Sequence, residues 1–340
     1  MRALDRPTPR MLAIAMLALM WALGGCGSSG TPGEPGAPKV LKVMSFNIYG
    51  GGVNDGKPVD ETVAVIRAAG ADIVGLQETR PETDPCTAQS CPPTGASVAK
   101  AIADALGFYY YDQTQDNPAL WANAVISRYP IGAATKHDLG VPIDVEGRTV
   151  YAYNVHFTDY PYQPYQLLKI PYGEAPFLTS GEQAVAAAKD ARDPALKLLA
   201  EDLTASDGAA AAFVFGDFNE PSHRDWTQRA VAAGNQPMVV AWPTSLALER
   251  LGFTDALRAA HPDEVAKPAF TWTPSTERTD PADHHDRIDY VLVRAGPGGD
   301  RDKKAVVEAA SIVGEKAPEA DIVVTPYPSD HRSVVASVRF

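Results

Sequence analysis

The segment AAAFVFGDFNEP, residues 210–221, is an apolar strand that ends in carboxylate and amide side chains. Successive residues of a strand point to opposite faces, so Asp217 and Asn219 lie on the same face. A single polar residue at a strand end is ordinary turn chemistry. Two such side chains on one face, directly after a buried strand, indicate instead that this strand ends at a site.

Five other segments join apolar strand-like sequence to carboxylates, amides or histidines. They read SFNIYG (45–50), GLQE (75–78), NVHF (154–157), RIDY (287–290) and SDH (329–331). The same alternation puts Asn154 and His156 of the third segment on one face. Each segment alone has a structural explanation, but the whole set predicts that several strand ends meet at one cleft.

The body of the chain alternates strands and helices without regular βαβ pairs. The predicted strands are Leu41–Tyr49, Asp72–Glu78, Phe108–Gln113, Asn123–Tyr129, Arg148–Phe157, Ala210–Phe218, Arg287–Arg294, Ala305–Val313 and Ser333–Phe340. The predicted helices are Val59–Ala69, Ser97–Leu106 and a helix that Ser180 and Gln183 open with a capping-box pattern, continuing past Pro194 to about Leu203. This pattern predicts a mixed or antiparallel sheet protein with helices packed outside, as one domain over residues 40–340.

Composition and charge exclude several protein classes. The 340 residues are 45% hydrophobic and 21% charged, which is typical of a globular protein and excludes general disorder. The formal net charge is -12, and Lys and Arg are scattered rather than gathered in a stripe. Nucleic-acid backbones are bound by concentrated positive charge. We therefore expect no specific nucleic-acid partner, and we expect a monomer.

The first 25 residues are typical of an export signal. Residues 1–25 combine arginines at positions 2, 6 and 10 with the apolar stretch Met11–Leu23. The sequence LGGC at 23–26 resembles the lipobox of bacterial lipoproteins, in which cleavage leaves a lipid-modified cysteine at the new N-terminus. We expect Cys26 to carry this lipid, residues 26–39 to form a flexible tether and the protein to be exported and anchored to a membrane. Plain secretion with a chance cysteine is the alternative.

Export also bears on the two remaining cysteines. Cys86 and Cys91 lie in the proline-flanked segment DPCTAQSCPP. An oxidising compartment favours disulfide formation, so we expect these two cysteines to pair and to rigidify one loop.

The six strand-end motifs, in the order SFN, LQE, NVHF, GDFN, RIDYV and SDH, resemble those of the endonuclease/exonuclease/phosphatase superfamily. This superfamily includes deoxyribonuclease-I-like nucleases, neutral sphingomyelinases and inositol polyphosphate phosphatases. The resemblance covers residues 41–340. It implies an α/β (α+β) fold, a four-layer α/β/β/α sandwich of two mainly antiparallel sheets, with the strand ends converging on one cleft.

The resemblance also implies a role for each motif residue in hydrolysis at phosphorus. Glu78 would be the metal ligand, Asn47 would orient the metal site and Asp330 would add a metal carboxylate. Asp217 and Asn219 would position the attacking water and hold a phosphoryl or leaving oxygen, and His156 would donate to a phosphoryl oxygen. His331 would contact the phosphate or act as the base, with Asp289 fixing its ring. The sequence leaves open whether Asp217 or His331 is the base. We expect Mg2+ as the cofactor, with Mn2+ able to substitute, because oxygen ligands suit hard cations.

Substrate recognition is assigned to residues beyond these motifs. Tyr160, Tyr162 and Tyr165 stand among prolines in the segment after His156, either as a specificity wall over the cleft or as a packed surface loop. His223 lies four residues past Asn219, as a substrate contact or a structural loop residue. Trp226, Trp242 and Trp272 are expected mainly in the core, with stacking on a substrate as the alternative. His284 and His285 are expected mainly in a solvated loop, with a role near the cleft as the alternative.

These observations predict an exported, metal-dependent phosphoester hydrolase acting on a small or medium substrate, either a diester or a monoester. A nuclease or a sphingomyelinase-type phosphodiesterase is the alternative within the enzymes. A catalytically inactive, surface-binding lipoprotein is the alternative of another class.

The lipobox yields a test of the export prediction. Replacing the thiol in Cys26→Ser removes the only atom to which the lipid could be attached at this position. The variant should move from the membrane fraction to a soluble or uncleaved form, as followed by fractionation and immunoblotting. An unchanged distribution would count against the lipobox.

Overall fold

The computed structural model describes residues 40–82, 95–296 and 305–340. Cys26, Cys86 and Cys91 lie outside the described residues, so their lipidation and pairing stay predictions. Within the described residues, no helix combines the length and the apolar character needed to span a bilayer.

The described strands form two sheets. The first has seven strands in the order β11-β10-β12-β1-β2-β4-β3, and the second has five in the order β5-β6-β7-β9-β8. The strands of the first are β1 (Val40–Asn47), β2 (Ile73–Gln77), β3 (Tyr109–Gln113), β4 (Asn123–Ser127), β10 (Val306–Gly314), β11 (Ile322–Val323) and β12 (Ser333–Arg339). Those of the second are β5 (Gly140–Val145), β6 (Arg148–His156), β7 (Ala211–Asp217), β8 (Thr254–Asp255) and β9 (Asp289–Ala295). Neighbours are antiparallel except β1–β2, β6–β7 and β10–β11.

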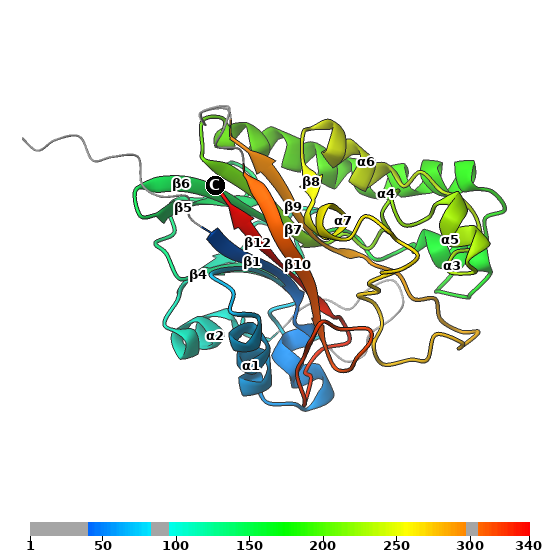
Figure 1. Cartoon of the computed structure of the whole chain (residues 1–340), viewed down its shortest axis with the longest axis horizontal. Coiled ribbons are helices and arrows are strands. Elements are labelled where there is room, and N and C mark those ends of the chain that lie inside the picture. Colours follow the sequence, from blue (N-terminus) through cyan, green and yellow to red (C-terminus); the bar gives the residue numbers. More distant parts are fainter. Residues whose placement is uncertain (1–39, 83–94, 297–304) are drawn as a thin grey trace, which may run out of the picture. The chain divides into compact units, whose positions relative to one another are not determined.

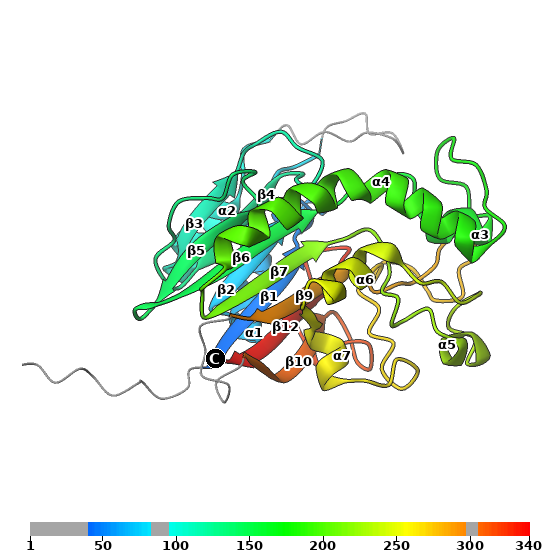
Figure 2. The same cartoon turned by 90° about the horizontal axis from the view of Figure 1, so that it is seen from above.

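Helices cover both outer faces of the paired sheets (Figure 1). The outer face of the first sheet packs against α1 (Val59–Ala69) and α2 (Ala99–Leu106). The outer face of the second packs against α4 (Gly181–Asp202) and α6 (Pro243–Arg250), and Figure 2 shows α4 lying along it. Between the sheets lies an apolar core that includes Val43, Val125 and Phe213. The four-layer sandwich of mainly antiparallel sheets is therefore confirmed.

Local sequence signals account for the long helix α4. Ser180 Oγ accepts a hydrogen bond from the backbone amide of Gln183 at 3.3 Å, as the capping pattern predicts. Gln183 Oε1 accepts from the Thr179 amide at 2.8 Å, one residue before the cap. The helix runs on through Pro194 without a break, because the packing of Ala195 and Leu199 against the second sheet overrides the proline.

Some short elements were absent from the sequence prediction. Strand β5 contains Pro142, a residue that argues against a strand, yet β5 lies at a sheet edge where a missing N–H is tolerated. The tyrosine-rich segment expected to be a loop contains the helix α3 (Gln163–Leu168), which has a proline in its first turn. The other short helices are the 3-10 turns η1 (Tyr49–Asp55) and η2 (Leu203–Ser206), α5 (Gln228–Ala232) and α7 (Ala256–Ala260).

A polar clamp joins the two sheets beneath the strand ends. Asn154 on β6 donates through Nδ2 to the carbonyls of Leu76 and Ala124, both at 2.9 Å, and its Oδ1 accepts from Gln77 Nε2 at 2.6 Å. Gly75 permits this contact, because a Cβ there would lie 2.7 Å from Phe215 Cβ and 2.8 Å from Asn154 Oδ1. The clamp therefore fixes how the strand ends of one sheet face those of the other.

The close sheet contact predicts a steric effect at Gly75. In Gly75→Ala the new methyl group would overlap backbone-proximal atoms of the facing sheet, which cannot move without opening the core. Overpacking of this kind costs about 1–3 kcal/mol of the free energy of unfolding. Denaturant unfolding followed by circular dichroism should show the loss. A curve superimposable on that of the wild type would contradict the contact.

Candidate active site

The strand ends meet because of the directions of the strands. β1 and β2 are parallel, so Asn47 and the residue after β2, Glu78, reach the same edge. β6 and β7 are parallel and pair His156 with Asp217 in register. β9 and β12 start at this edge, since each runs antiparallel to a strand that finishes there. Sheet topology therefore gathers residues that are far apart in sequence.

Asp217 stands at the centre of the cluster and is 1% exposed. Its Oδ2 accepts a hydrogen bond from Asn47 Nδ2 at 3.0 Å. The same oxygen lies 3.6 Å from His156 Nε2 and 3.6 Å from His331 Nε2. The other oxygen, Oδ1, accepts a hydrogen bond from the backbone amide of Asn219 at 2.9 Å. One carboxylate thus lies between two imidazoles and accepts hydrogen bonds from two amide groups, which leaves it little freedom to rotate.

Glu78 adds a second carboxylate. Its Oε1 accepts from Asn47 Nδ2 at 2.7 Å and lies 4.0 Å from His156 Nε2. Burial, together with the nearby carboxylate of Asp330, raises the pKa of Glu78 well above its usual value. Burial likewise raises the pKa of Asp330 and Asp289. Burial therefore disfavours the charged forms of these three carboxyl groups.

His331 is held by a buried carboxylate. Its Nδ1 lies 3.0 Å from Asp289 Oδ2, and its backbone amide donates to Ser329 Oγ at 3.0 Å. Ser329 Oγ in turn donates to the Asn47 carbonyl at 2.7 Å, which joins this segment to β1. Burial acts to lower the pKa of His331, but the carboxylates of Asp289 and Asp217 outweigh it and hold the pKa well above its usual value. The imidazolium form is therefore favoured.

The donor set fits a hard divalent cation. Two groups of residues each offer three ligand atoms within 4.8 Å of one another. They are Glu78–His156–Asp217 and Asp217–Asp289–His331. In the described part of the chain, Asp289 Oδ1 and Asp330 Oδ1 are buried without a hydrogen-bond partner. Carboxylate oxygens in excess of their hydrogen-bond donors are what such a cation requires.

The residues predicted to form the metal site differ in whether they belong to a candidate metal-binding group. Glu78 belongs to one of the candidate groups, and Asn47 bonds to it through Nδ2. Asp330 is close enough to raise the pKa of Glu78 but belongs to neither group. Asn219 uses its side-chain Nδ2 to donate to the Phe157 carbonyl at 3.0 Å, so in this structure its amide joins two loops.

His223 makes its contacts on α6. Its Nδ1 lies 2.9 Å from Ser245 Oγ, and its Nε2 lies 3.0 Å from Glu249 Oε2. Both ring nitrogens are thus engaged outside the cluster, which fits the structural alternative rather than a substrate contact. His284 Nε2 lies 2.8 Å from Gln236 Oε1, and His285 Nε2 lies 2.9 Å from Thr276 Oγ1. The expectation of a solvated loop is wrong for His285, which is 6% exposed and packs edge-on against the ring of Phe270. None of the three belongs to a candidate metal group of the described residues.

Five aromatic rings form a continuous surface beside His331, here called the aromatic wall. Its members are Tyr160, Tyr162, Tyr165, Tyr172 and Trp272. Ring centroids of successive members lie 5.1–6.1 Å apart, and Trp272 lies 6.4 Å from the ring of His331. Tyr162 is 3% exposed and supports the wall from behind. The other four rings are partly exposed and can face a substrate.

Carboxylates hold the wall in place through the tyrosine hydroxyl groups. Tyr162 donates to Asp286 Oδ2 at 2.9 Å, Tyr172 donates to Asp159 Oδ2 at 2.7 Å, and Tyr165 donates to Asp283. Three of the four tyrosine hydroxyl groups are thus engaged with carboxylates, which fixes the orientation of their rings.

Two tryptophans lie near the cluster, and the sequence favoured neither as a site residue. Trp272 was expected mainly in the core, as Trp226 and Trp242 are, but it pairs with His331 in an isolated β-bridge. Trp121 meets the ring of His156 edge-on at 5.7 Å and was not singled out at all. The position of Trp272 shortly before the RIDY motif was the available signal, whereas Trp121 lies in a segment without a motif.

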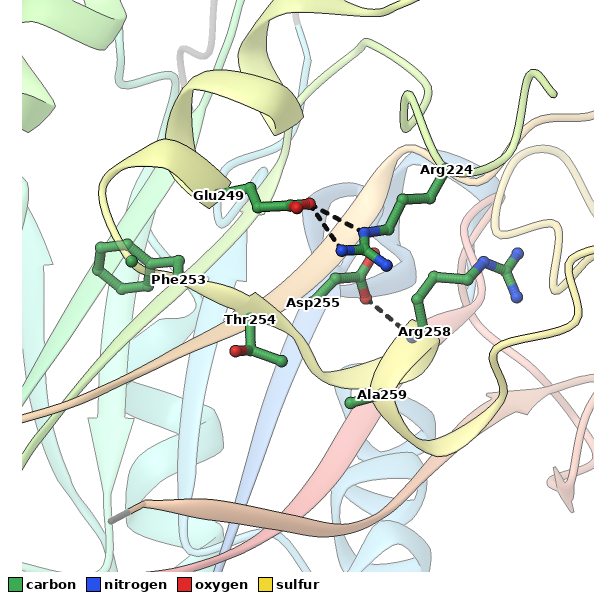
Figure 3. A pocket seen from close by; sticks show the side chains of 8 residues that line it. Arg224, Glu249, Phe253, Thr254, Asp255, Arg258 and Ala259 are labelled. Carbon is green, nitrogen blue, oxygen red and sulfur yellow. Dashed lines mark hydrogen bonds and ion pairs between the residues drawn. The ribbon is translucent and has the colours of Figure 1, made fainter. Parts of the chain in front are cut away.

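A separate hollow of about 340 Å³ lies away from the cluster (Figure 3). It is lined by Arg224, Glu249, Gly252, Phe253, Thr254, Asp255, Arg258 and Ala259. The Arg224 and Glu249 side chains pair with each other at 2.9 Å, and Arg258 donates to Asp225 at 2.6 Å. Its charges are therefore already paired, and none of the predicted site residues lines it.

Comparisons with known proteins agree with this fold. A Caenorhabditis elegans protein, F14F9.5, which is described as uncharacterised, is 24% identical over 311 residues, covering 88% of this chain and 91% of that protein. Two solved structures share the fold with TM-scores of 0.50. One is D. rerio TDP2 complexed with a single-strand DNA product, at 14% identity over 88% of this chain and 98% of that one. The other is a variant of the 3' phosphatase NExo from Neisseria bound to a product DNA hairpin, at 16% identity over 87% of this chain and 98% of that one.

A sequence model described as the endonuclease/exonuclease/phosphatase family matches residues 44–331, which include every residue of the cluster. The resemblance carried by the six strand-end motifs is confirmed, and the chain belongs to the endonuclease/exonuclease/phosphatase family.

Proposed function

We propose that the protein is an exported hydrolase of phosphoesters that depends on a divalent cation, with Mg2+ as the physiological ion. The observation that carries the proposal is Asp217, a buried carboxylate set between two histidines and next to Glu78. Hydrolysis at phosphorus requires a base for water and donors for the phosphoryl oxygens. The cluster supplies both kinds of group on one edge of the sheets.

The residues divide the chemistry as follows. A cation held by Glu78 and its neighbours would neutralise charge on the phosphoryl and leaving oxygens. Asp217, with its carboxylate held in place, would accept a proton from the attacking water. His331 has one nitrogen on Asp289 and the other facing Asp217, so it is arranged as a donor to phosphoryl oxygen. This geometry supports Asp217 over His331 as the base, the choice that the sequence left open.

The complete set of site residues argues against an inactive binding protein. The residues are Asn47, Glu78, His156, Asp217, Asn219, Asp289, Asp330 and His331. A pseudoenzyme would be free to lose some of them. Burying several carboxylates together also costs stability, which is hard to explain without a function.

The wall supports a small or medium phosphoester that carries a ring or an apolar group. Partly exposed aromatic rings next to His331 would pack against such a group.

A nucleic-acid substrate is the second candidate, because the TDP2 and NExo structures hold DNA products. The net charge of -12 favours the first candidate. A sphingomyelinase-type diester stays a third possibility to be tested in the same panel.

The proposed reaction predicts a requirement for divalent cations. Chelation by EDTA followed by dialysis should abolish hydrolysis of a panel of phosphomonoesters and diesters, including DNA and sphingomyelin, and Mg2+ should restore it. Glu78→Gln should weaken Mn2+ binding measured by calorimetry, while Glu201→Gln, which removes a surface carboxylate paired with Lys136, should not. Full turnover in EDTA would refute the proposal.

The Asp289–His331 pair predicts a graded loss of activity. His331→Ala removes a positioned proton-transfer or phosphate-binding group, so kcat/KM should fall about 10²–10⁴-fold in a protein that is still folded at the assay temperature. Its melting temperature should fall as well, because Asp217 and Asp289 lose a buried partner. Asp289→Ala should cause a smaller loss, since it acts through the histidine. His137→Ala, on the surface beside Glu201, is the matched control and should keep full activity. Near-normal kcat/KM in a folded His331→Ala would show that this residue has no catalytic role.

A further inference from the structure

Arg192 is a buried cation that no catalytic step above uses. It lies in the middle of α4, and its side chain is fully buried. A helix that covers a sheet normally presents apolar residues inward, as Ala188 and Ala195 do here. An arginine on the inward face loses its hydration, so it requires several hydrogen bonds in compensation.

The guanidinium group donates to two loops of the site. Nε donates to the Phe218 carbonyl at 3.1 Å, and Nη2 donates to the carbonyls of Asn219 and, at 3.0 Å, of Thr158. Phe218 and Asn219 directly follow Asp217, whereas Thr158 lies two residues after His156. One side chain therefore ties together the backbone that leaves the central carboxylate and the backbone that leaves one of its histidines.

The same group also reaches the base of the aromatic wall. Nη1 donates at 2.6 Å to Gln163 Oε1, on the first residue of α3, which carries Tyr165. Its charge is balanced by Glu220, whose Oε2 lies 3.9 Å from Nη1. Glu220 is itself fixed by the amide and hydroxyl of Thr244, at 2.8 and 2.9 Å.

Arginine suits this position better than lysine. A planar guanidinium presents five N–H donors in a rigid fork, whereas an ammonium presents three from one atom. The acceptors around Arg192 are the three backbone carbonyls and the amide oxygen of Gln163, which approach from different directions. A lysine could keep the charge beside Glu220 but could not hold all of these groups at once.

We propose that Arg192 is a positioning residue of the active site. It sets the spacing between the segment after His156 and the segment after Asp217, and it links that spacing to the aromatic wall. It touches neither the reacting atoms nor the substrate. The proposal rests on the proposed phosphoester hydrolase function for its kinetic test, and it has a second test that needs no activity.

The kinetic test compares two matched buried arginines. Arg192→Lys should lower kcat by about 10²-fold, because misplacement by about 1 Å has that effect, while KM changes little. Arg258→Lys is the control, since Arg258 is also buried, pairs with one aspartate and donates to three backbone carbonyls, but lies on α7 away from the cluster. Both variants are to be assayed well below their melting temperatures. The double variant Arg192→Met/Glu220→Gln serves if Arg192→Lys does not fold.

The second test follows hydrogen exchange of the two loops. The Phe157 amide donates to the Asp217 carbonyl at 3.0 Å, and the Asn219 amide donates to Asp217 Oδ1. Both amides should exchange faster in Arg192→Lys and at the wild-type rate in Arg258→Lys.

The outcomes separate the two proposals. Unchanged exchange, or a kcat equal to that of the wild type, in a folded Arg192→Lys would overturn the positioning role. Equal loss of kcat in both variants would also overturn it, because the effect would then be general destabilisation. A wild-type protein that hydrolyses no phosphoester would refute the proposed function alone, and the exchange measurement would still decide the role of Arg192.

Discussion

The hydrogen bonds of Asn154 across the gap between the sheets are the interaction on which the rest of the structure depends. Two apolar sheet faces can slide over each other at little cost, because hydrophobic contact is not directional. An amide that must satisfy carbonyls of the opposite sheet permits only one arrangement. Since the clamp lies directly below the strand ends, it also fixes which polar residues of the two sheets face each other.

The cluster above the clamp is built from groups that would be unfavourable one at a time. Asp217 is almost fully buried, and a buried carboxylate without partners is costly. The cost is reduced by His156, His331 and the Asn47 amide, which all point at it. Because the backbone of each partner belongs to a strand or is tied to one, these partners cannot drift away. The fixed arrangement of the cluster is therefore a consequence of sheet topology.

The fold class and the main site could be predicted because their signals are local in sequence. A strand that ends in GDFN or NVHF shows both its apolar run and its terminal side chains within a few residues. The role of Arg192 could not be predicted in this way. An arginine within a helix is expected to be solvent-exposed, and only the packing of the helix on a sheet shows that this one is buried. The helix α3 was likewise not predicted, and Trp272 was expected mainly in the core, because only tertiary contacts bring the tyrosine segment next to His331. His223 shows the converse case, in which nearness in sequence to Asn219 left a substrate contact open, whereas both ring nitrogens contact α6 in the structure.

The charge balance of the site also links stability to function. Burial raises the pKa of Glu78, Asp289 and Asp330, so the folded protein binds protons at these carboxyls more tightly than the unfolded chain does. Stability from these groups is present at low pH and is lost as the pH rises from about 4, the usual carboxyl value, through the raised values. The imidazolium of His331 offsets part of this loss, because its own raised pKa keeps a positive charge in the cluster at neutral pH. A divalent cation that binds only the folded state would offset more of it, since ligand binding to the native state adds to stability. The carboxylates that would bind the cation are thus the same groups that lower the stability of the fold when no cation is bound. The hydrogen bonds of Asn154 across the two sheets oppose this destabilisation.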